Sequence, residues 1–172
     1  MEMSHLSYAA PLLSLALLWT VAVVTPGPNF FNIAQLAASQ SKRHGVVAAL
    51  GVATGTVLWG LAGGLGIKSL FSAAPTLYLG FKIAGGCYLI YLGLKQFKRK
   101  APVTAGDNRL IADAGRTLWS VYGQGFLGNM TNPKSALFVA TIFATAMPAT
   151  VPPMLLALAV LTMATLSFSW NC

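Results

Sequence analysis

Two short stretches place helix-breaking residues and polar residues together inside apolar segments. They are TPGPN at 25–29 and GNMTNPK at 128–134. A proline removes one backbone N–H and displaces the carbonyl four residues earlier from its helical hydrogen bond. A helix that restarts beyond the break presents N–H groups and partial positive charge. Such a pair of breaks could bind a carboxylate at the helix N-termini and an ammonium group at the released carbonyls. We expect the released carbonyls to be those of Ala22, Val24 and Asn129.

The residues before two of the prolines fit helix caps. Thr25 precedes Pro26, and Asn132 precedes Pro133. Threonine and asparagine are favoured N-caps, and proline is favoured at the first helical position. We therefore predict that new helices begin at Pro26 and Pro133, with both N-termini directed at one ligand.

Polar side chains surround both breaks. Asn29, Asn32 and Gln35 follow the first break at helical spacing and share a face. Lys134 is an ionisable residue inside an apolar segment, which indicates function, although a lysine reaching to the membrane surface is the alternative. A merely kinked span is the alternative for each break. The candidate substrate-binding residues are Thr25, Pro26, Gly27, Pro28, Asn29, Asn32, Gln35, Asn129, Asn132, Pro133 and Lys134.

The composition is that of a membrane protein. Of 172 residues, 56% are hydrophobic and only 8% are charged, with a mean hydropathy of +0.69. A soluble domain carries about 25% charged residues. The net charge of +8 comes from bases in short loops, which argues against nucleic-acid binding. The two cysteines, Cys87 and Cys172, lack metal-ligand spacing, so no metal and no cofactor are predicted. No catalytic constellation is present, so we do not expect an enzyme.

Five apolar runs predict an all-α bundle of membrane spans. The runs cover 8–41, 46–67, 77–94, 119–147 and about 152–170. Runs one and four carry the breaks, so we expect two inverted three-helix halves with broken first and fourth helices. The halves are 1–97 and an incomplete 117–172, joined by a basic loop at 98–116, within one domain; a sixth helix is missing from the expected set.

The bases predict the orientation. They gather at Lys42, Arg43 and the 95–116 loop, which places these segments in the cytoplasm and the 68–76 hairpin outside. The side of the N-terminus stays open, because the first break could make a crossing plus a half-crossing. Small residues such as Gly51 and Gly55 favour tight helix packing over sliding of helices.

At these residues the sequence resembles the lysine exporter superfamily, and within it the RhtB family of homoserine and threonine exporters. The matching pieces are TPGPNFF, SKRHGVVAALGVATG, GGCYLIYLG and GFLGNMTNPKSALF. The resemblance implies a six-span inner-membrane carrier that exports amino acids in exchange for protons, with a homodimer as one arrangement. It carries over Pro26, Gly27, Pro28, Asn29, Asn132, Pro133 and Lys134 as substrate-pathway residues.

Two features depart from that family. The chain stops within the fifth run, and no Asp or Glu lies inside a span to relay protons. We therefore keep two hypotheses: a secondary exporter of small neutral amino acids such as threonine or homoserine, and a truncated, transport-inactive membrane paralogue or scaffold subunit. The substrate cannot be chosen from the sequence, although the lack of a buried acid argues against a dibasic one.

Overall fold

The computed structural model describes residues 8–73, 83, 117–148 and 150–172. The predicted third run at 77–94 and the basic loop at 95–116 lie outside these residues, apart from residue 83. The described elements are all helices: α1 (Ala9–Val24), α2 (Pro28–Ser39), α3 (Lys42–Ala73), α5 (Leu118–Met130), α6 (Pro133–Ala146) and α7 (Pro153–Asn171). The prediction of an all-α membrane fold is confirmed.

Length and apolar composition identify the elements that can cross a membrane. Within the described ranges, α3 over Lys42–Gly66 and α7 over Pro153–Asn171 qualify on their own. The pair α1 and α2 qualifies together as one broken span, bent by 56°. The predicted fourth run divides into α5 and α6, of which α6 is apolar but shorter than a span.

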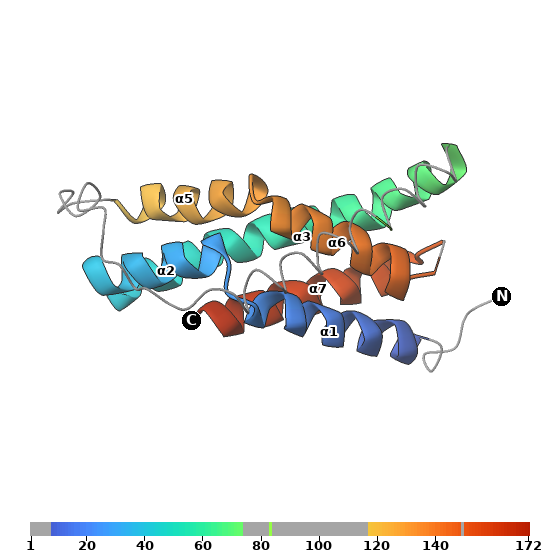
Figure 1. The fold of residues 1–172 in the computed structure, drawn as a ribbon, viewed down its shortest axis with the longest axis horizontal. Helices are drawn as coiled ribbons and strands as arrows, with labels where there is room; N and C mark the ends of the chain where they lie inside the picture. Colours follow the sequence, from blue (N-terminus) through green and yellow to red (C-terminus); the bar gives the residue numbers. More distant parts are fainter. Residues whose placement is uncertain (1–7, 74–82, 84–116, 149) are drawn as a thin grey trace.

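The helices of the bundle run in two opposite directions (Figure 1). The pair α1–α2 runs opposite to the pair α5–α6; α3 runs in the same direction as α5–α6, and α7 in the same direction as α1–α2. Helix α3 packs against α2, α5, α6 and α7, while α1 packs against α6 and α7. These directions are those expected of two inverted halves that each open with a broken helix.

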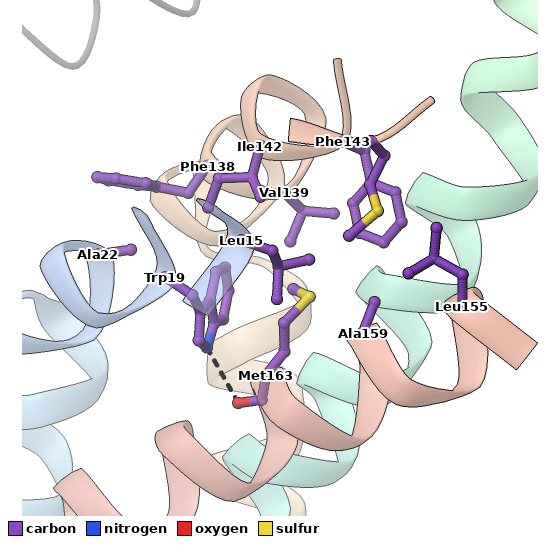
Figure 2. Close-up of a cluster of buried hydrophobic side chains, with 11 residues drawn as sticks. Leu15, Trp19, Ala22, Phe138, Val139, Ile142, Phe143, Leu155, Ala159 and Met163 are labelled. Carbon is purple, nitrogen blue, oxygen red and sulfur yellow. Dashed lines mark hydrogen bonds between the residues drawn. The ribbon is translucent and has the colours of Figure 1, made fainter. Parts of the chain in front are cut away.

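A hydrophobic core holds α1, α6 and α7 together (Figure 2). Leu15, Phe143, Leu155 and Met163 are almost fully buried in it. The indole of Trp19 adds a polar tie, because its Nε1 donates to the Met163 carbonyl and to Ser167 Oγ, both at 3.0 Å. A second cluster joins α2, α3 and α5 through Ile33, Leu36, Ala48, Ala49, Val52 and Val121.

Glycines bring α3 and α5 into backbone contact. A Cβ on Gly51 would lie 2.2 Å from the Tyr122 carbonyl oxygen, and one on Gly125 would lie 2.1 Å from that of Ala48. No side chain larger than hydrogen fits at either place. The small-residue spacing therefore serves tight packing, which fixes α5 against α3 just before the second break.

Candidate substrate site

The first break separates α1 from α2 by the three residues 25–27. The predicted cap at Thr25 is wrong. Thr25 ends α1, where its N–H and its Oγ1 donate to the Val21 carbonyl at 3.2 and 2.7 Å. Gly27, in extended conformation, is the N-cap of α2, and Pro28 rather than Pro26 lies in the first turn. The reason is steric: a residue before proline is disfavoured in helical conformation, so Gly27 cannot easily be helical before Pro28.

The second break follows the prediction. Helix α5 ends at Met130, α6 begins at Pro133, and Asn132 is the N-cap. The Asn132 Oδ1 accepts a hydrogen bond of 3.0 Å from the Lys134 backbone N–H. The cap predicted at this break is confirmed.

Two side-chain contacts join the breaks, although they lie about a hundred residues apart in the sequence. Lys134 Nζ donates to the Thr25 carbonyl. Asn29 Nδ2 donates to Asn129 Oδ1 at 2.9 Å. The lysine chain passes close to Gly27, where a Cβ would lie 3.2 Å from its Cδ. The glycine thus leaves room for the lysine to reach the end of α1.

Asn129 connects four segments. Its Nδ2 donates to the Val52 carbonyl at 2.9 Å and to Thr56 Oγ1 at 3.2 Å on α3. Its Oδ1 accepts from Asn29 and, at 2.6 Å, from Ser135 Oγ on α6. The side chain is 2% exposed and uses its full capacity of two donors and two acceptors. Asn129 therefore holds the site together.

The carbonyl of Asn129 is not available to a ligand as predicted. It accepts from Trp59 Nε1 at 3.2 Å and from the Asn132 N–H at 3.2 Å. Pro133 does remove this carbonyl from regular helical hydrogen bonding, but the Trp59 indole and the Asn132 N–H donate to it instead. The Thr25 carbonyl, which was not among the predicted ones, is the group that faces the Lys134 ammonium.

A cavity of about 60 Å³ lies between the breaks and α7. At roughly 10–15 Å³ per water, it holds on the order of five water-sized groups, which is the scale of a small metabolite. Its walls combine apolar and polar side chains from α1, α2, α3, α5, α6 and α7. The lining residues are Trp19, Ala22, Val23, Thr25, Gly27, Asn29, Phe30, Val52, Thr56, Asn129, Asn132, Lys134, Ser135, Phe138, Ser167 and Asn171.

Some candidates from the sequence line this cavity and others do not. Those that line it are Thr25, Gly27, Asn29, Asn129, Asn132 and Lys134. The three prolines shape the helix ends without lining it. Asn32 accepts a hydrogen bond of 2.8 Å from Gln124 Nε2, away from the lining, and Gln35 is exposed on α2. Helical spacing therefore predicted the cavity-lining residues of α2 correctly only within the first turn of the helix.

Four polar residues of the cavity wall were not predicted from the sequence: Thr56, Ser135, Ser167 and Asn171. Hydroxyl residues within apolar helices give a weak signal, because many bond only to their own helix. Thr20 and Thr162 do so, each donating to the carbonyl four residues earlier. Polar residues on the fifth apolar run could have been considered, but only packing shows which ones face inward.

The cavity is electropositive. Lys134 is the basic residue of its lining, and its ammonium lies over the Phe138 ring at 5.6 Å from the centroid. The first turns of α2 and α6 reach the same cavity and add partial positive charge. The chain's acids, Glu2, Asp107 and Asp113, all fall outside the described residues. Within the described part, no group of three or more His, Cys, Asp or Glu could hold a metal ion.

Comparison with known proteins gives a consistent family. The model of the LysE type translocator family matches residues 20–172. The threonine efflux protein of Escherichia coli strain K12 is 28% identical over 135 residues, covering 76% of this chain and 64% of that protein. The threonine efflux protein of Salmonella typhi is 27% identical over 134 residues, covering 76% and 63%. An uncharacterized membrane protein of Haemophilus influenzae is 30% identical over 132 residues, also covering 76% and 63%.

The chain matches less than two thirds of the length of these relatives. No solved structure matches it.

Proposed function

This chain belongs to the LysE type translocator family, and on that premise we propose that it is a secondary carrier exporting small neutral α-amino acids across the inner membrane. Threonine and homoserine are the first candidates, since two relatives are named threonine efflux proteins. The 95–116 loop is cytoplasmic in this proposal. Exchange for protons and pairing into a homodimer are parts of it that rest on the family resemblance.

One observation carries the proposal: the ammonium group of Lys134 donates a hydrogen bond to the Thr25 carbonyl at the end of α1. Thr25 closes α1, whose C-terminus carries partial negative charge, so its carbonyl favours a cation. A lysine from the other break supplies that cation. An amino-acid substrate brings an ammonium group of the same kind, together with a carboxylate.

The substrate carboxylate would pair with Lys134. Charge-assisted hydrogen bonds between ammonium and carboxylate are stronger than bonds to a neutral carbonyl. The first turn of α6 adds its partial positive charge beside Ser135, which also lines the cavity. Pairing with the carboxylate would draw Lys134 Nζ away from Thr25.

The substrate ammonium would then take the Thr25 carbonyl that Lys134 has left. The side-chain oxygen of Asn29 is a second acceptor beside it, because the Asn29 amide nitrogen is the group that bonds Asn129. The substrate ammonium thus gains the Thr25 carbonyl only after the substrate carboxylate has drawn Lys134 away. This exchange predicts a requirement for a zwitterion, which a carboxylate or an amine alone does not meet.

Counterflow in proteoliposomes tests the proposal. Vesicles containing the purified full chain are loaded with unlabelled threonine, and uptake of labelled threonine is measured. We expect uptake that homoserine and alanine inhibit. An amino alcohol without a carboxylate and a hydroxy acid without an ammonium group should compete on the order of tenfold less well.

The matched variants are Lys134→Met and Lys42→Met. Lys42 is exposed at the start of α3, so its loss should leave counterflow unchanged. Loss of Lys134 should lower it on the order of tenfold or more. Normal counterflow by Lys134→Met would refute the role of the lysine. An absence of counterflow for every neutral amino acid would favour the transport-inactive paralogue or scaffold.

A further inference from the structure

Helix α7 contributes two polar residues to the cavity that the proposed exchange of charges does not use. Ser167 and Asn171 lie one turn apart and both line the cavity. Ser167 is 2% exposed, and Asn171 is half-buried. Polar side chains one turn apart on an apolar helix share a face, and here that face is directed at the cavity.

Among the described residues, the hydrogen bonds of Ser167 do not use its hydroxyl proton. Trp19 Nε1 donates to Ser167 Oγ, so this oxygen is an acceptor for the indole. The same indole also donates to the Met163 carbonyl, which lies four residues before Ser167 and would be its usual helical acceptor. No described residue accepts the Ser167 hydroxyl proton. A buried hydroxyl donor without an acceptor is costly, so this proton calls for a partner in the cavity.

Within the part of the chain that the structure describes, the hydrogen bonds of Asn171 do not use its side-chain oxygen. Its Nδ2 donates to the Ser167 carbonyl at 2.7 Å, which fixes the orientation of the amide. No described residue donates to its Oδ1. The pair therefore presents one donor, from Ser167, and one acceptor, from Asn171, to the same space.

We propose that Ser167 and Asn171 form a subsite that binds a hydroxyl group on the side chain of the substrate. A hydroxyl accepts one hydrogen bond and donates another through a single oxygen, which matches the pair. A methyl group does neither, and an ammonium group cannot accept. A primary amide offers both functions but on two separate atoms, which suits a cavity of about 60 Å³ less well. This subsite rests on the proposed function and narrows its substrates to hydroxy amino acids.

The apolar lining supports the assignment. Ala22, Val23 and Phe138 line the same cavity and can contact the carbon atoms of a short side chain. The charged groups at Lys134 and the helix ends would hold the amino and carboxyl groups. The α7 pair then decides between side chains of the same shape, because binding an analogue that lacks the hydroxyl would leave the polar groups of Ser167 and Asn171 unpaired.

The test is competition between threonine and valine, which differ by a hydroxyl in place of a methyl group. Labelled alanine counterflow is measured in proteoliposomes while either competitor is added. For the unaltered chain we expect threonine to inhibit on the order of tenfold more strongly than valine. Ser167→Ala and Asn171→Leu should bring the inhibition by the two competitors to within about twofold of each other.

Ser120→Ala is the matched control, because Ser120 is exposed on α5 outside the cavity and should keep the preference for threonine. Equal inhibition by threonine and valine in the unaltered chain would overturn the subsite and leave the carrier proposal intact. So would stronger inhibition by asparagine or glutamine than by threonine. A preference that survives both α7 substitutions would show that the pair binds only water. An absence of any counterflow by the unaltered chain would instead overturn the proposed function.

Discussion

The two helix breaks contain similar residues but are built differently. At the first, three residues separate the helices, and the N-cap Gly27 makes no side-chain hydrogen bond. At the second, two residues separate them, and the N-cap Asn132 bonds the following turn. Asn129, one turn earlier, uses every hydrogen-bonding group of its side chain.

The difference shows which break is a fixed frame and which depends on it. The second break is held by its own cap and by bonds to α3, independently of the first. The first break is held largely by groups that come from the second, namely Lys134 and Asn129. A ligand that engages Lys134 would therefore release the first break while the second keeps its shape. Four substitutions, each with a control, probe this contrast.

The largest expected effect is that of Gly125→Ala, which removes the support of the second break. A methyl group there would lie 2.1 Å from the backbone oxygen of Ala48, so α3 and α5 must separate. We expect the free energy of unfolding to fall by about 3 kcal/mol, seen as a lower thermal midpoint of the purified protein in detergent.

Gly123→Ala is the control for that prediction. A Cβ at Gly123 meets nothing within 4 Å. It should leave stability unchanged or raise it by about 0.5–1 kcal/mol through helix propensity. Equal losses for the two alanines would contradict the contact between α3 and α5.

The next effect is that of Asn129→Ala, which removes four side-chain hydrogen bonds. At about 0.6 kcal/mol for each interhelical bond in a membrane protein, we expect a loss of about 2 kcal/mol. Asn32→Ala breaks one bond, to Gln124, and should cost several-fold less. Thermal unfolding of both variants gives the comparison, and a similar drop in the two midpoints would show that Asn129 is not the main support.

The smallest effects come from the caps themselves. Asn132→Ala should cost about 1 kcal/mol, and Asn132→Ser should recover most of it, because serine also caps. Gly27→Ala loses no cap bond, but its methyl would press on Lys134 Cδ at 3.2 Å. We expect Gly27→Ala to lower stability by a few tenths of a kcal/mol, and this loss to disappear when Lys134→Met is also present. Additive losses in the double variant would contradict the contact.

Much of the fold could be read from local patterns. The apolar runs predicted helices at α1, α3, α6 and α7, and the prolines predicted where the broken helices are interrupted. Asn132 was predicted as a cap because asparagine is a favoured N-cap and Pro133 follows it at the first helical position. Thr25 was wrongly predicted as an N-cap because either Pro26 or Pro28 could begin α2. Only the extended conformation of Gly27 shows that α2 begins at Pro28.

Fewer features of the candidate site could be predicted from local patterns. Asn29 and Asn129 stood out as amides beside prolines, but their mutual bond joins residues a hundred positions apart. Ser167 was not predicted at all, since its role depends on an indole 148 residues earlier. Gln35 had the right residue type and the right spacing, yet it lies on the exposed side of α2.

The order of the amino acids alone was enough to place the interruptions, because proline acts on its own backbone and on the carbonyl one turn before it. It was enough as well to put the chain in a bilayer. Which oxygen accepts the hydrogen bond of the Lys134 ammonium, and which two polar residues of α7 line the cavity, depended on how the helices pack. Those contacts join segments that meet only in the folded bundle, where glycines allow the helix backbones to approach closely.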